Sequence, residues 1–77
     1  MQIELKEQSR EGSGTSATAT FYIYVDKKVM EDDIFVTANK ETATLHVHQE
    51  YADFTLQELE RLVMEMRKQS EKIKYAH

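Results

Sequence analysis

Two histidines and a glutamate alternate along the stretch TLHVHQE, which has the residue types of a metal site. Alternate side chains of an extended chain point the same way, so His46, His48 and Glu50 would share one face. Imidazole nitrogens and carboxylate oxygens are ligands that Zn²⁺ accepts. Alternate strand positions are about 7 Å apart, so a further ligand must come from elsewhere, and the sequence offers only Asp53 and His77. We therefore predict no metal and no cofactor.

Catalytic chemistry is not indicated either. The chain has no cysteine to act as nucleophile, no Gly-rich phosphate loop, and no serine in a strand-to-helix elbow. Four acids gather in one region, Asp26, Glu31, Asp32 and Asp33, but their spacing is not that of a calcium loop. A domain this small also offers little concavity to enclose a substrate. We expect no enzyme activity and no small-molecule substrate.

Composition limits the class of protein further. The chain of 77 residues carries 14 acids and 10 bases, a net charge of −4, spread along its whole length. Duplex nucleic acid needs a clustered basic face, so this balance disfavours it. The apolar runs are far shorter than a membrane span, which needs about 20 residues, and the first residues do not resemble a secretory signal. We expect a cytoplasmic protein without a membrane partner.

The first two thirds of the sequence have the alternation of β-strands. We predict strands at about residues 2–6, 17–25, 34–38 and 42–48, within a sheet that spans about residues 2–50. Both glycines lie in residues 9–16, which predicts a flexible loop. Asn39 follows the third strand and suits a tight turn with positive φ. Short connections between successive strands favour an antiparallel meander.

The last third predicts one amphipathic helix from about residue 55 to about residue 74. Thr55 and Glu58 have the spacing of a capping box, and neither Gly nor Pro follows them. Several apolar residues share one stripe at helical spacing: Leu56, Leu59, Leu62, Val63, Met66 and Ile73. Sheet and helix each need the other to bury an apolar face. The predicted fold is therefore α+β, a single domain over residues 1–77 with a four-stranded meander and one C-terminal helix on one face (β-β-β-β-α).

A single helix covers only one side of a sheet. The more apolar positions of the strands, such as Phe21, Ile23 and Val36, should face the helix. The opposite face then carries five large aromatic or imidazole side chains, Tyr22, Tyr24, Phe35, His46 and His48, among threonines. Such side chains offer large contact area with few rotatable bonds, which is typical of binding surfaces. Strand propensity alone also enriches Tyr, Phe and Thr on exposed faces, so a purely structural origin is the competing interpretation.

Protein binding fits this inventory best. We predict a small acidic, non-enzymatic interaction module, a regulator, an inhibitor or a self-associating accessory protein, which binds through the open sheet face. Its partner would be another protein or a second copy of the chain, in a homodimer formed by two open faces or two edge strands. The alternative is single-stranded nucleic acid stacked on the same aromatics. It is disfavoured because basic side chains such as Lys27 and Lys40 lie at strand ends, and those of the helix should point away from the open face.

Overall fold

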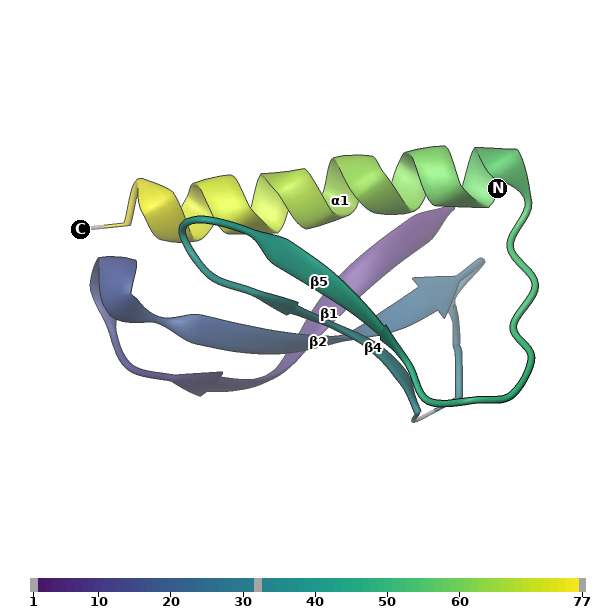
Figure 1. The fold of residues 1–77 in the computed structure, drawn as a ribbon. Coiled ribbons are helices and arrows are strands. Elements are labelled where there is room, and N and C mark those ends of the chain that lie inside the picture. Colours follow the sequence, from purple (N-terminus) through teal and green to yellow (C-terminus); the bar gives the residue numbers. More distant parts are fainter. Residues whose placement is uncertain (1, 32, 77) are drawn as a thin grey trace.

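The computed structural model describes residues 2–31 and 33–76, and it shows an α+β fold. The elements in chain order are β1 (Ile3–Glu11), the 3₁₀ helix η1 (Gly14–Ser16), β2 (Thr18–Val25), β3 (Lys28–Val29), β4 (Ile34–Ala38), β5 (Ala43–Val47) and α1 (Leu56–Lys74). The strands form one antiparallel sheet in the order β1-β2-β4-β5, and α1 lies across one side of it (Figure 1). The predicted fold class is confirmed. Two residues named above lie outside the described residues: Asp32, a member of the acidic group, and His77, a possible further metal ligand.

A short fifth strand, β3, adds to the four predicted strands. Asp26 and Lys27 have φ values of 49° and 71°, and the residues on either side, Val25 and Lys28, pair with each other. Two successive positive φ angles in a two-residue loop define a type I′ turn, whose twist matches that of the adjoining strands. This turn folds β3 back against the end of β2, where Met30 N donates to Ile23 O at 2.7 Å.

The loop that contains both glycines is shorter than predicted. Strand β1 continues through Glu11, so residues 9–11 belong to the sheet rather than to the predicted loop 9–16. The pairing of β1 with β2 shifts at Gln8, between Glu7 and Ser9, which is a β-bulge. Gly12 then has φ +81°, and a Cβ there would lie 2.9 Å from the Ser16 carbonyl oxygen. This close turn requires glycine.

The turn between β4 and β5 uses Asn39 differently from the prediction. Asn39 does not have positive φ. Its side-chain oxygen instead accepts hydrogen bonds from the amides of Glu41 at 2.8 Å and Thr42 at 3.0 Å. A short amide side chain can close a turn in this way without a left-handed backbone. The Ser70 hydroxyl of α1 donates to the Asn39 carbonyl at 2.7 Å, so the turn is also joined to the helix.

The hydrophobic core lies between the sheet and α1. Alternate residues of the strands are buried there, as their pattern predicts, together with Ala17 just before β2: Ile3, Ala19, Phe21, Ile23, Ile34, Val36 and Ala38. The helix contributes Leu62 and Ile73, each 2% exposed, and Met66 packs against the same cluster. The cross-strand register places Ala19 beside Ala38 and Ala38 beside Ala43, so small side chains lie together in this part of the core face.

The helix starts as predicted but buries a narrower stripe. The capping box is present: Glu58 N donates to Thr55 Oγ1 at 3.1 Å, and Thr55 N donates to the Glu58 carboxylate at 2.8 Å. The predicted stripe is wrong for three of its members, Leu56, Leu59 and Val63, which are 71%, 38% and 50% exposed. At about 100° per residue, Leu56 and Val63 lie roughly 100–120° around the axis from Leu62, and Leu59 lies about 60° away on the same side. The small sheet does not cover this flank of the helix. Within the described ranges, no helix has the length and apolar character needed to cross a membrane.

Candidate functional site

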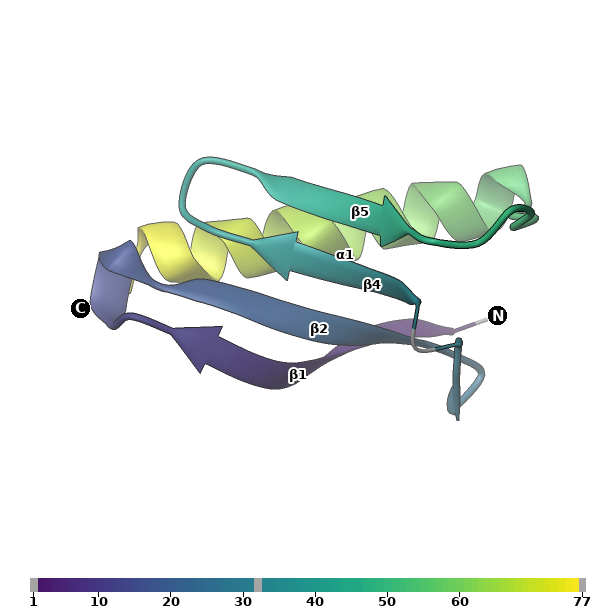
Figure 2. The same cartoon turned by 60° about the horizontal axis from the view of Figure 1, so that its bottom comes forward.

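The open face is the side of the sheet opposite α1. Figure 2 shows β5, β4, β2 and β1 side by side with the helix behind them. The predicted binding residues all come from this side: Tyr22, Tyr24, Phe35, His46 and His48. The first four occupy strand positions that alternate with those of the core face, and His48, just after β5, is stacked on Phe35. The first four are partly buried and His48 is exposed. No element among residues 2–31 and 33–76 covers them.

The strand register aligns four of the side chains on the open face in one row. Lys6 pairs with Tyr22, Tyr22 with Phe35, and Phe35 with His46. These residues, which we call the aromatic row, cross the whole sheet from β1 to β5. Directly paired residues of antiparallel strands have Cβ atoms about 4.5–5.5 Å apart, so neighbours in the row are in contact range. The row is therefore one continuous surface and not a set of scattered side chains.

A second row runs beside the first and is made of hydroxyl groups. Ser9 pairs with Thr20, Thr20 with Thr37, and Thr37 with Thr44. Thr20 and Thr37 are partly buried, whereas Ser9 and Thr44 are exposed. Hydroxyls can both donate and accept hydrogen bonds. The open face thus presents flat rings next to a line of adaptable polar groups.

Three rings of the open face pack against one another. The Phe35 ring is stacked on His46, with centroids 4.6 Å apart and planes 12° from parallel. It is also stacked on His48 at 5.7 Å, and the two imidazoles are 6.1 Å apart. Offset stacked rings at such distances attract each other beyond their burial of area. Each ring therefore limits the rotation of the others, so the three side chains are already oriented before any partner binds.

The orientation of the His46 and His48 rings determines whether both could bind one metal ion, as their spacing in the sequence suggests. An imidazole donates its lone pair in the plane of its ring, so stacked rings direct their lone pairs along separate lines. His46 Nε2 is 2.8 Å from the Thr37 hydroxyl oxygen and already has a hydrogen-bonding partner. Among the described residues, no three His, Asp or Glu side chains gather closely enough to hold an ion. In this arrangement the pair presents ring faces rather than converging ligands.

Lys6 is a member of the open face that sequence reasoning missed. Its Nζ lies 4.4 Å from the centre of the Tyr24 ring, a cation–π contact, and its pairing with Tyr22 places it at one end of the aromatic row. The signal was available, because Lys6 alternates with Ile3 and Leu5 at positions that must face away from the core. Glu4 pairs with Tyr24 on the same face, so the positive charge has an acidic neighbour.

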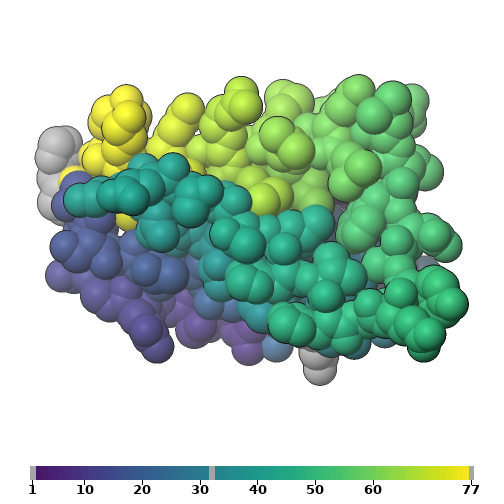
Figure 3. Space-filling model, in the orientation of Figure 1, coloured from purple at the N-terminus to yellow at the C-terminus, as the bar shows by residue number. Residues whose placement is uncertain are grey.

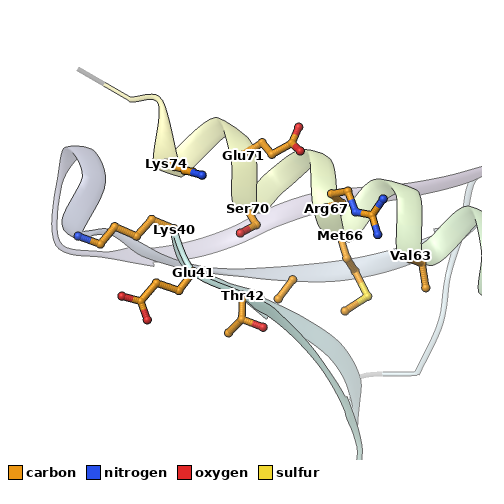
Figure 4. Close-up of a pocket in the computed structure, with 10 residues that line it drawn as sticks. Lys40, Glu41, Thr42, Val63, Met66, Arg67, Ser70, Glu71 and Lys74 are labelled. Atoms are coloured by element: carbon orange, nitrogen blue, oxygen red, sulfur yellow. The ribbon is translucent and has the colours of Figure 1, made fainter.

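A groove of about 480 Å³ lies apart from the open face, between the β4–β5 turn and α1 (Figure 4). Ala43, Val63 and Met66 supply apolar lining, and Val63 and Met66 point from the helix towards the strands. The rest of the lining is polar or charged: Lys40, Glu41, Thr42, Arg67, Ser70, Glu71 and Lys74. None of the predicted site residues lines this groove, so it is a separate surface.

Comparison of the chain with protein-family models, with curated proteins and with solved structures found no match.

Proposed function

We propose that this protein is a non-enzymatic interaction module that binds another protein through the open face. The observation that carries the proposal is the continuous aromatic row, flanked by Tyr24 and His48 and left uncovered by the described elements. Tyr, Phe and His side chains lose little conformational entropy on binding, and the stacking of Phe35 with His46 reduces that loss further. A partner that covers the row would therefore gain contact area at low entropic cost.

The Thr37 hydroxyl and the His46 imidazole form a hydrogen-bonded pair of the kind found in catalytic dyads. A nucleophilic hydroxyl beside a histidine base also needs hydrogen-bond donors placed for the developing oxyanion. Thr37 lies in the middle of β4, whose neighbours β2 and β5 pair with it on both sides. The backbone N–H groups next to Thr37 are thereby used in the sheet ladder. We infer that the pair orients the imidazole for binding and does not perform acyl transfer.

The test compares two tyrosine variants with a matched control. Tyr22→Ser and Tyr24→Ser remove rings from the open face, whereas Met64→Ser removes a side chain that is 63% exposed on the outer side of α1. A protein captured by the native chain and by Met64→Ser, but bound at least tenfold more weakly by the tyrosine variants, supports the proposal. Circular dichroism of each variant checks that the fold is retained. A partner lost from Met64→Ser and kept by Tyr22→Ser would place the interface on the helix instead.

Single-stranded nucleic acid is a second candidate because Lys6 lies among the aromatics. Bases stack on aromatic rings, and a cation beside them can contact the phosphate backbone. Glu4 and Glu11 pair with Tyr24 and Thr18 on the same face and would oppose that contact. Fluorescence anisotropy of a labelled oligothymidine at low salt distinguishes the candidates. Binding that weakens with added salt and with Lys6→Gln would favour nucleic acid, and unchanged anisotropy would leave the protein partner as the proposal.

A further inference from the structure

Strand β5 forms one edge of the sheet, with only β4 beside it among the described residues. Its hydrogen bonds towards β4 alternate along the chain, as in any antiparallel pair. Two bonds fix the phase: Asn39 N donates to Thr42 O, and His48 N donates to Asp33 O. Residues 44 and 46 therefore direct their backbone groups towards β4. The N–H and C=O groups of Ala43, Leu45 and Val47 point outward, where the described chain gives them no partner.

The β5 edge lacks the features with which proteins usually protect a free edge. Its residues, ATLHV, contain no Lys, Glu or Pro, and its pairing with β4 has no bulge. The opposite edge strand, β1, carries charged residues throughout and is interrupted by the bulge at Gln8. Charges and bulges on an edge prevent another strand from pairing with it. The contrast marks β5 as the edge that is open to pairing.

Apolar side chains lie exposed next to this edge, on the helix side of the sheet. Val47 of β5 is 41% exposed, although it pairs with the buried Ile34 on the core face. On the adjoining flank of α1, Leu59 is 38% and Val63 is 50% exposed. Figure 3 shows the β5 segment at the surface directly below the helix. A strand added to β5 would cover the apolar surface that the protein's own helix leaves exposed.

The two ends of β5 carry opposite charge. Near its start, the groove lining holds three bases, Lys40, Arg67 and Lys74, against two acids, Glu41 and Glu71. Just beyond its end lie three acids: Glu50 follows the strand, and the carboxylates of Glu31 and Asp33 accept hydrogen bonds from Gln49. An antiparallel neighbour with the same sequence would bring its acidic end to the basic end of β5. A second copy therefore complements this edge in charge at both ends.

We propose that β5 pairs antiparallel with β5 of a second copy, about a twofold axis at Leu45. This register is the one that pairs all five residues of the strand. It places Leu45 opposite Leu45 of the second copy, and Val47 opposite Ala43 of the second copy. The outward backbone groups of residues 43, 45 and 47 then bond reciprocally. Ala43 lines the groove with Val63 and Met66, so the Val47 side chain of the second copy would lie beside the apolar part of that groove.

The proposed dimer has one continuous sheet of both copies. Because the twofold axis is perpendicular to the sheet, both helices lie on the same side, with Leu59 and Val63 of each copy facing the seam. The two open faces join on the other side, and neither is covered. The edge pairing is therefore independent of the proposed binding function, and each can fail without the other.

The first experiment is sedimentation equilibrium over a concentration series from micromolar to millimolar. We expect a reversible dimer of twice the 9.0 kDa chain. Val47→Lys should raise the dimer dissociation constant at least tenfold, since it places a charge at the seam. Val29→Lys is the matched control: Val29 is 48% exposed on β3, away from β5, and this variant should dimerise like the native chain. A monomer at all concentrations, or equal effects of the two variants, would overturn the proposal.

Amide hydrogen exchange of the unmodified chain tests the register without any substitution. The amides of Thr44 and His46 bond to β4 and should be protected at every concentration. Those of Leu45 and Val47 point outward and should become protected only as the dimer forms. Exchange of Leu45 and Val47 that stays fast while the mass doubles would show that the dimer uses another surface, such as the open face. Tyr22→Ser should leave this protection unchanged.

A charge exchange completes the test. In the proposed register, Lys40 approaches Glu50 of the second copy. Lys40→Glu and Glu50→Lys should each weaken the dimer several-fold, and the double variant should recover most of the native affinity. Failure of the double variant to recover, with native-like circular dichroism, would rule out this alignment of the two strands.

Discussion

The two faces of the sheet are made from alternate residues of the same strands, yet they differ in exposure and in the kind of contact that their side chains make. On the helix side, Phe21, Ile23 and Val36 are at most 2% exposed and belong to one hydrophobic cluster. On the open side, Tyr22, Phe35 and His46 retain solvent contact and are joined by stacking and cross-strand pairing. The fold needs the first face to bury its apolar area. It makes no comparable demand on the second, so large rings there are available for another purpose.

The contrast between the faces is sharpest at neighbouring residues of β2. Phe21→Ala should lower the free energy of unfolding by about 3–5 kcal/mol, because it leaves a cavity in the core. Tyr22→Ala should cost about 1 kcal/mol, since the ring is partly exposed and loses mainly cross-strand contacts. Urea denaturation monitored by circular dichroism measures both. Equal losses from the two substitutions would mean that the open face is buried in solution by some further contact.

The same comparison extends to the two sides of α1. Leu62→Ala should cost about 2–5 kcal/mol, because Leu62 is 2% exposed between helix and sheet. Leu56→Ala should change stability by less than about 0.5 kcal/mol, since Leu56 is 71% exposed and alanine favours helix. Thermal unfolding of both variants at low protein concentration gives the comparison. A large loss from Leu56→Ala would show that a second molecule covers this flank.

The sequence was sufficient to predict the four longer strands, the helix and the faces of the sheet because alternation and capping act locally. The period of two in residues 17–25 leaves only one side apolar, and Thr55 with Glu58 marks one helix start. Both signals depend on residues within a few positions of each other. The alternation also placed Tyr22, Tyr24, Phe35, His46 and His48 on one side of the sheet.

The features that the sequence did not predict depend on contacts between distant residues. Helical spacing places Leu56 and Val63 on one flank of the predicted stripe, but the width of the sheet beneath the helix decides whether that flank is buried. The hydrogen bond from Ser70 to the Asn39 carbonyl joins residues far apart in the chain. Likewise, Lys6 meets Tyr24 only because of the register between β1 and β2. Register is set by the whole sheet, so local patterns cannot specify it.

An isosteric substitution in β4 tests the core face without changing its volume. Val36→Thr puts a hydroxyl at a position with 0% exposure and should cost about 1–3 kcal/mol, since the group is buried among apolar neighbours. The readout is the urea midpoint at constant denaturant slope. An unchanged midpoint would mean that the interior of β4 admits water or finds the hydroxyl a partner.

The reverse substitution at the next residue should have the smallest effect and is the most informative about the open face. Thr37→Val removes the hydroxyl that lies 2.8 Å from His46 Nε2 and should cost about 0.5–1.5 kcal/mol at most. Valine keeps the shape and favours strands, so part of that loss is offset. If the hydroxyl orients the imidazole, the NMR signals of the His46 ring should shift while those of the core methyl groups stay in place. Unmoved His46 signals would mean that stacking on Phe35 alone fixes the ring, and the hydroxyl row would then act only as a polar border to the aromatic row.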